Sequence, residues 1–187
     1  ALNFPFNANG STFTLGEDDI SQSMFYAEEF ANSGDVYGMI YPYNNLLGAE
    51  EPKLLPLQVW VKQSELEDLS EGYIPTSEMT LVFSDTVEIL PGMEELYIPF
   101  DMPIAYNGIE NLVIQHYQFD PEWPPAILRF EMEVVPSGPI RTLSATDVFG
   151  LDPNEEIEFY NDYTDHNVVT FVIDPTVLVY IMKNKAN

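Results

Sequence analysis

The chain contains no cysteine, and this absence removes several kinds of chemistry at once. Disulfide bonds, metal sites built on thiolates and cysteine nucleophiles are all excluded. The absence assigns no cellular compartment, because a secreted domain of 187 residues is large enough to fold without disulfides.

Basic residues are scarce: 6 Lys and Arg stand against 31 Asp and Glu, which gives a formal net charge of −25. Proteins bind nucleic acids and anionic membrane surfaces through Lys and Arg, so neither is an expected partner. Two interpretations of the acidity stay open. It provides a solvated, soluble surface, or it supplies carboxylate oxygens for a divalent cation such as Ca²⁺.

Long apolar runs are also lacking. The longest late run, residues 168–182, is interrupted by Asp174 and Pro175, and no run approaches the ~18 residues that span a bilayer. We therefore expect no membrane insertion. The first ten residues show neither the basic nor the apolar part of a signal peptide, so any export signal has been removed or lies outside this chain.

The chain is rich in aromatic and turn-forming residues. Twelve Phe, 11 Tyr and 2 Trp, within a hydrophobic fraction of 45%, suffice for one core, and we expect a single domain over residues 1–187. Fifteen Pro and 10 Gly are spread along the sequence, which excludes long helices.

Alternating segments predict strands. In residues 57–62 (LQVWVK), Leu57, Val59 and Val61 share one face of such a strand. Roughly ten such segments recur about every 8–12 residues, which indicates an all-β sandwich or barrel. Two short helices are expected, one turn in AEEF and one at residues 64–69 (SELEDL), where Ser64 and Glu67 have the capping-box spacing.

The central stretch, residues 95–115, predicts a hairpin-like unit of two strands. Apolar runs at residues 96–100 and 111–115 flank a segment rich in turn residues. Asn107 and Gly108 form the expected turn, because both tolerate positive φ. Pro103 can end the first strand by removing a donor. The side-chain amide of Asn111 can hold backbone groups of the loop.

Five segments follow one another in an order that resembles a secreted β-sandwich domain of Bacteroidetes, related to the jelly-roll adhesin domains of gingipain-type proteins. They are YAEEF (26–30), LQVWVK (57–62), LVFSDTVEI (81–89), LYIPFDMPIAYNGIENLVI (96–114) and IRTLSATD (140–147). The chain departs from that pattern at Asp85, where glycine is common, and at Ile104, where phenylalanine is usual. The resemblance implies an antiparallel, jelly-roll-like sandwich with at most one or two helical turns. It also implies an extracellular or cell-surface accessory or adhesion module, one part of a larger exported protein.

Catalytic signatures are missing from the sequence. Its two histidines are predicted to be structural or exposed: His116 lies within a strand, and His166 lies in a polar loop. The motifs GxSxG, HExxH, GxGxxG and the P-loop do not occur. We therefore expect a protein that is not an enzyme.

Three acidic clusters are candidates for Ca²⁺. The best is formed by Asp152, Asn154 and Glu156, whose alternate spacing matches the start of an EF-hand loop, although Ile157 occupies the position of its glycine. The other clusters are residues 17–19, and Asn161 and Asp162 with Asp165. Calcium is accordingly a candidate cofactor.

Three aromatic residues are candidates for ligand binding. Trp60, Tyr117 and Trp123 can form a flat platform on which sugar rings stack, and prolines on both sides of Trp123 stiffen its loop. The alternative is that Trp60 packs under a second layer of structure.

Three functions follow from these observations. The first is a non-catalytic extracellular module for adhesion or interaction, with a protein or glycan partner at the cell surface. The second is a carbohydrate-binding module accessory to a secreted hydrolase. The third is a hydrolase that uses a pair of carboxylates, which a deep cleft with two facing acids would reveal.

Overall fold

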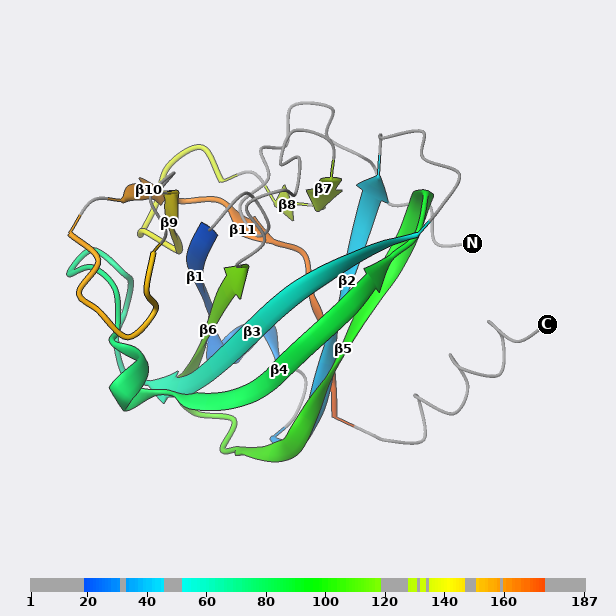
Figure 1. Ribbon diagram of the computed structural model, residues 1–187. Coiled ribbons are helices and arrows are strands. Elements are labelled where there is room, and N and C mark those ends of the chain that lie inside the picture. The colour runs from blue at the N-terminus through cyan, green and yellow to red at the C-terminus, as the bar shows by residue number, and fades with distance from the viewer. Residues whose placement is uncertain are drawn as a thin grey trace.

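A computed structural model describes residues 19–30, 33–45, 52–118, 128–130, 132–133, 135–146, 151–158 and 160–173 (Figure 1). The strands in these ranges are β1 (Asp19–Phe25), β2 (Gly34–Asn45), β3 (Lys53–Ser64), β4 (Thr80–Ile89), β5 (Gly92–Tyr106), β6 (Asn111–Gln118), β7 (Leu128–Phe130), β8 (Met132–Glu133), β9 (Thr142–Thr146), β10 (Asn161–Tyr163), β11 (His166–Asn167) and β12 (Thr170–Val172). The helical elements described are two short 3-10 turns, η1 (Ala27–Glu29) and η2 (Thr76–Glu78).

The strands form two main antiparallel sheets. The larger has the order β10-β9-β1-β6-β3-β4, and the smaller has the order β12-β2-β5 with β7 paired to β2. A separate ladder joins β11 to β8. The prediction of an all-β, antiparallel sandwich is confirmed, and so is the helical turn within AEEF. Jelly-roll connectivity stays a prediction.

The main core lies between the two sheets. Leu57, Val59 and Val61 of β3 are buried there, as their alternation predicts, and they belong to the same cluster as Tyr41 of β2 and Ile98 of β5. Burial of each such side chain contributes about 1.5–3 kcal/mol to folding. This inner face holds the two sheets together.

A second apolar cluster covers the outer face of the larger sheet. Met24 of β1, Val113 of β6 and Leu143 of β9 pack with Leu69 and Ile74 from the segment between β3 and β4. β6 is therefore covered on both faces, which agrees with its nearly continuous burial, polar residues included. The segment that covers the sheet also forms one wall of the pocket described below.

The predicted hairpin-like unit is wrong. β5 continues through Pro103 to Tyr106 and pairs with β2 in the smaller sheet, whereas β6 lies in the larger sheet. The turn itself is confirmed. Gly108 has φ +74°, and Asn107 Oδ1 accepts hydrogen bonds from the backbone N–H groups of Ile109 and Glu110. Asn107 and Gly108 thus connect the two sheets.

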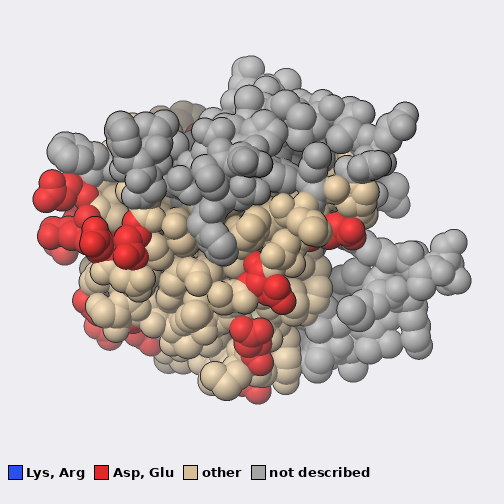
Figure 2. All heavy atoms as spheres, viewed as in Figure 1, with Lys and Arg blue, Asp and Glu red and all other residues tan. Residues whose placement is uncertain are grey.

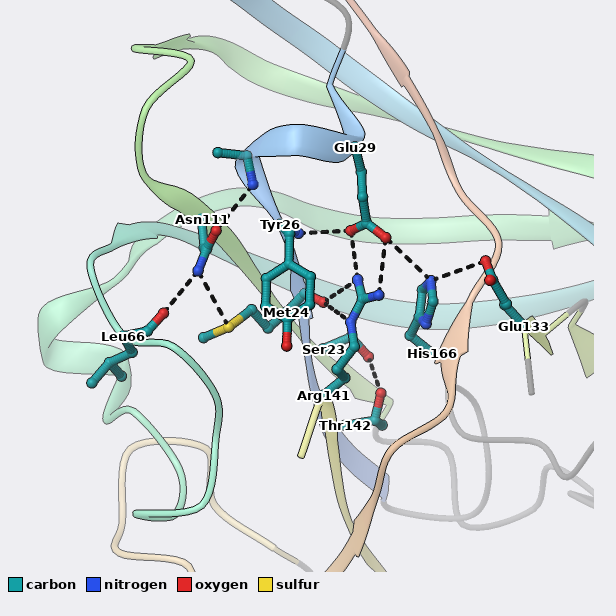
Figure 3. Close-up of polar contacts among 11 residues, drawn as sticks. Ser23, Met24, Tyr26, Glu29, Leu66, Asn111, Glu133, Arg141, Thr142 and His166 are labelled. Atoms are coloured by element: carbon teal, nitrogen blue, oxygen red, sulfur yellow. Dashed lines mark hydrogen bonds and ion pairs between the residues drawn. The ribbon is translucent and has the colours of Figure 1, made fainter. Parts of the chain in front are cut away.

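Asn111 holds two backbone segments, but the prediction that it braces its own loop is wrong, because both segments lie outside that loop. Its Oδ1 accepts from Ala27 N at 3.0 Å, and its Nδ2 donates to Leu66 O at 2.8 Å (Figure 3). The side chain thereby ties η1 to the segment that follows β3.

The helix predicted at residues 64–69 is wrong, because tertiary pairing overrides the local capping signal. β3 extends through Ser64, which pairs with Asn111 of β6. The Ser64 hydroxyl accepts from Leu66 N at 3.2 Å and forms a local turn in place of a helix cap.

The part of the chain that the structure describes has no helix with the length and hydropathy needed to cross a membrane.

Candidate functional site

The predicted aromatic platform does not form as expected. Trp60 and Tyr117 do lie on the same outer face of the larger sheet, because Trp60 pairs with Gln115, two residues before Tyr117. Trp60 is only 7% exposed, however, so its indole offers no open stacking surface, and the alternative of a covered Trp60 is correct. Tyr117 is half-buried, and Trp123 lies outside the described residues.

The predicted calcium residues sit on an exposed turn that is already held by hydrogen bonds. Asp152 Oδ1 accepts from both Asn154 N and Asn154 Nδ2, each at 2.8 Å. Thr76 Oγ1 donates to Pro153 O at 3.0 Å. Within the described ranges, no group of three or more His, Cys, Asp or Glu is placed to hold a metal ion. Calcium binding stays a prediction. The turn also forms one wall of a surface cavity.

That wall belongs to a surface cavity of about 620 Å³ between residues 71–75 and residues 153–160, which we call the acidic pocket. Four exposed glutamates line it, namely Glu71, Glu155, Glu156 and Glu158. Figure 2 shows carboxylates gathered at the left of the molecule, where Figure 1 places both segments, and shows no Lys or Arg among the described residues of this face. The cavity has the size of a small-molecule site, with a lining that disfavours anions.

Two tyrosines give the pocket an ordered aromatic side. The rings of Tyr73 and Tyr160 meet edge to face at 5.4 Å and 78°. Tyr73 is anchored by donating to Ile20 O at 2.8 Å. Gly72 has φ +102°, and a Cβ there would lie 2.9 Å from the Tyr160 hydroxyl oxygen. The absent side chain of Gly72 therefore lets Tyr160, which is 37% exposed, lie against this segment.

A chain of amides connects the sheet to the pocket wall. Gln22 Oε1 accepts from Ile74 N at 3.0 Å, and Gln22 Nε2 donates to Ile74 O at 2.6 Å, which fixes the orientation of the Gln22 amide. Gln22 Nε2 also donates to Gln115 Oε1 at 2.7 Å. Gln115 lines the pocket and is 1% exposed, and its Nε2 has no hydrogen-bond acceptor among the described residues.

A second polar centre, which we call the Arg141 network, comprises Arg141, Glu29, Tyr26, His166 and the Met24 carbonyl. Arg141 is 6% exposed and forms a bidentate pair with Glu29, with an Nη1–Oε1 distance of 2.9 Å (Figure 3). Its Nε and Nη2 donate to Met24 O at 3.1 and 2.9 Å. The guanidinium carbon lies 4.3 Å from the centre of the Tyr26 ring. The network holds η1 and the start of β9 against β1.

His166 belongs to this network, and the prediction that it is an exposed loop histidine is wrong. It is 5% exposed, and its Nε2 lies 3.7 Å from Glu29 Oε1 and 3.6 Å from Glu133 Oε2. Burial, followed by the positive charge of Arg141, lowers the pKa of His166, although the carboxylates of Glu29, Glu133 and Asp165 act in the opposite direction. The imidazole packs edge-on against Phe25, with ring centres 6.1 Å apart.

His116 is structural, in agreement with one of the two predicted roles. It is 2% exposed on the inner face of β6, where its Nε2 shares a hydrogen bond of 3.1 Å with the Tyr41 hydroxyl of the opposite sheet. Burial lowers the pKa of His116 to about 3 and raises that of Tyr41. Neither histidine lines the acidic pocket.

The residues that sequence reasoning missed are those whose partners are distant in the chain. Glu29 and Arg141 are 112 residues apart, and Gln22 and Gln115 are 93 apart. One signal was available: Gln22 and Gln115 are polar residues inside otherwise strand-like runs, and such residues need a partner when buried. No protein-family model, curated protein or solved structure matches this chain.

Proposed function

We propose that this protein is a non-catalytic interaction module that acts outside the cell or at the cell surface and binds a protein or glycan partner. The acidic pocket supports this proposal, because its walls are fixed by hydrogen bonds and ring packing before any ligand arrives. Preorganised walls reduce the ordering cost of binding. The resemblance of the five ordered segments to a secreted Bacteroidetes domain supports the extracellular setting.

The proposal that the module is non-catalytic is supported by where the histidines and glutamates lie. Both histidines are buried away from the pocket and engaged in packing. The pocket's four glutamates are exposed, whereas a general acid of the carboxylate type is held in a desolvating environment. The arrangement favours binding over proton transfer.

A carbohydrate-binding module accessory to a secreted hydrolase is the second candidate. The observation that favours it is Tyr160, an aromatic ring on the pocket that is 37% exposed and positioned by Gly72 and Tyr73. Rigid aromatic rings with a polar tip suit ligands that have both apolar and hydroxyl-bearing faces.

The experiment combines binding and turnover on the same materials. Biosensor surfaces coated with mucin, fibrinogen or yeast mannan are exposed to the purified protein, and parallel samples are assayed for released reducing ends and peptides after a day. We expect saturable, reversible retention on at least one surface without product. Product formation, or no retention on any of the three, would contradict the proposal.

A further inference from the structure

One residue that lines the acidic pocket carries a buried hydrogen-bond donor that the described residues do not satisfy. Several buried polar atoms have no partner among the described residues, and Gln115 Nε2 is the one whose residue lines this pocket. A buried donor without an acceptor costs free energy, and such groups in native proteins are commonly explained by water, an ion or a ligand. Gln115 therefore points to a bound group that accepts a hydrogen bond.

The orientation of the Gln115 amide follows from the hydrogen bonds behind it. Ile74 presents both a backbone N–H and a carbonyl to Gln22, so the Gln22 amide can lie only one way round. Gln22 must then donate to Gln115 Oε1, which leaves Nε2 as the unpaired atom. The Gln115 side chain leaves the sheet on the pocket side, because Gln22, its partner across the ladder, reaches Ile74 in the pocket wall.

The lining restricts the charge of the ligand. An anion could accept from Gln115, but it would face Glu71, Glu155, Glu156 and Glu158 with no Lys or Arg in the lining. An ammonium group would suit the glutamates, but it carries only donors and cannot accept from Nε2. A neutral hydroxyl group accepts from Gln115 and donates to a carboxylate at the same time.

The tyrosines restrict the shape of the ligand. Tyr160 is a partly exposed ring held edge-on to Tyr73 and seated over Gly72. A ring with an apolar face of C–H groups and hydroxyls at its edge can pack on Tyr160 while its hydroxyls reach the polar groups. The cavity of about 620 Å³ is large enough for a small ligand of this kind.

We propose that the acidic pocket binds a neutral sugar residue of a glycan. One sugar hydroxyl accepts from Gln115 Nε2, other hydroxyls donate to the glutamates, and the ring packs on Tyr160. The inference rests on the proposed interaction function and assigns it a ligand class. The residues differ from the aromatic set that the sequence suggested, because Trp60 is buried.

The test is calorimetric titration with neutral tetrasaccharides of glucose, mannose, galactose, xylose and N-acetylglucosamine at 0.05 and 0.5 M NaCl. We expect at least one to bind with a Kd that changes less than about twofold with salt, since a neutral ligand is not screened. Tyr160→Ala and Gln115→Glu should each weaken binding at least about tenfold, the second because it keeps the acceptor for Gln22 and loses the donor. Glu88→Gln, exposed on β4 outside the pocket, is the matched control and should leave Kd unchanged.

Binding by none of the five sugars would overturn the sugar assignment, and so would sugar binding that survives both pocket substitutions. Spermine is titrated in parallel, and its binding alone, lost at 0.5 M NaCl, would assign the pocket to cations. Circular dichroism confirms that each variant is folded, and Tyr160→Ala at the exposed rim keeps the test valid if Gln115→Glu does not fold. Retention of the variants on the coated biosensor surfaces would leave the interaction function standing while the sugar assignment fails.

Discussion

The Arg141 network and the acidic pocket both set carboxylates beside aromatic rings, but their charges are balanced differently. In the network, the buried guanidinium meets Glu29, the Met24 carbonyl and the Tyr26 ring. In the pocket, four carboxylates line the cavity without a Lys or Arg, and a buried amide lacks an acceptor among the described residues. The guanidinium of the first site is paired within the protein, so its charge cluster is closed, although Tyr26 Oη and His166 Nδ1 there also lack a partner among the described residues. The carboxylates of the pocket meet no Lys or Arg in its lining, so its charge cluster is open. The contrast separates a residue set that maintains the fold from one that is available for binding.

The largest expected effect is the loss of Arg141. Arg141→Ala should lower the free energy of unfolding by about 3 kcal/mol, because the Met24 carbonyl loses its two charge-assisted donors, while Glu29, whose side chain is 35% exposed, stays partly hydrated. Arg141→Lys should recover only part of this, since an ammonium group cannot make the bidentate pair. Chemical denaturation provides the measurement.

Lys62→Ala is the matched control for Arg141, because it removes a salt bridge at the surface. Lys62 and Glu78 are 26% and 55% exposed, so this pair contributes less than about 1 kcal/mol. Equal losses for Arg141→Ala and Lys62→Ala would show that the network does not hold the fold together.

His116, in the core between the sheets, adds a group that supports the fold and whose contribution to stability depends on pH. Burial lowers its pKa to about 3 from 6.5, so below pH 6.5 the unfolded chain binds a proton that the folded protein does not. Stability from this group is fully present above pH 6.5 and is lost as the pH falls toward 3. The difference in unfolding free energy between wild type and His116→Gln should shrink by about 1.4 kcal/mol per pH unit below 6.5. Parallel stability curves for the two proteins between pH 7 and 5 would refute this.

Asn111 connects the two regions, because it joins η1, next to the network, to the segment that leads to the pocket wall. Asn111→Ala should cost about 2 kcal/mol for the two hydrogen bonds it removes. It should also speed amide exchange at residues 66–75. Asn107→Ala is the control, since Asn107 is exposed and the described hydrogen bonds of its side chain reach only Ile109 and Glu110 of the same turn, so its cost should be about 1 kcal/mol or less. Equal losses of unfolding free energy for Asn111→Ala and Asn107→Ala would show that Asn111 does not connect the two regions.

The sequence predicts the features of this protein that depend on local order. The alternation of Leu57, Val59 and Val61 gives the inner face of β3, and Asn107 with Gly108 gives the turn, because both depend on neighbouring residues. The predicted helix at residues 64–69 fails because Ser64 pairs with Asn111, a contact that no local pattern reveals. Pro103 fails to end β5 for a related reason, since pairing with β2 carries the strand on to Tyr106.

The candidate site was harder to predict than the fold. Asn154 and Glu156 were singled out as metal ligands and do line the pocket, but neither Tyr160 nor Gln115 was identified. Their roles arise where the covering segment, the outer sheet face and residues 153–160 meet, and each comes from a different part of the chain. Trp60 shows the converse case, because an alternating strand cannot tell an open face from one covered by a second layer.

The smallest expected effect on stability, and the sharpest test of the comparison, is the removal of charge from the pocket. Glu155→Gln with Glu158→Gln should change Tm by less than about 2 °C, and the change should be upward, because both side chains are exposed and their removal relieves repulsion in a chain of net charge −25. Sugar binding should nevertheless weaken, since a carboxylate accepts hydrogen bonds from hydroxyls more strongly than an amide does. Thermal unfolding and calorimetry on the same samples give both numbers. A fall in Tm comparable to that of Arg141→Ala would mean that these glutamates support the fold, and the distinction between a closed and an open charge cluster would no longer hold.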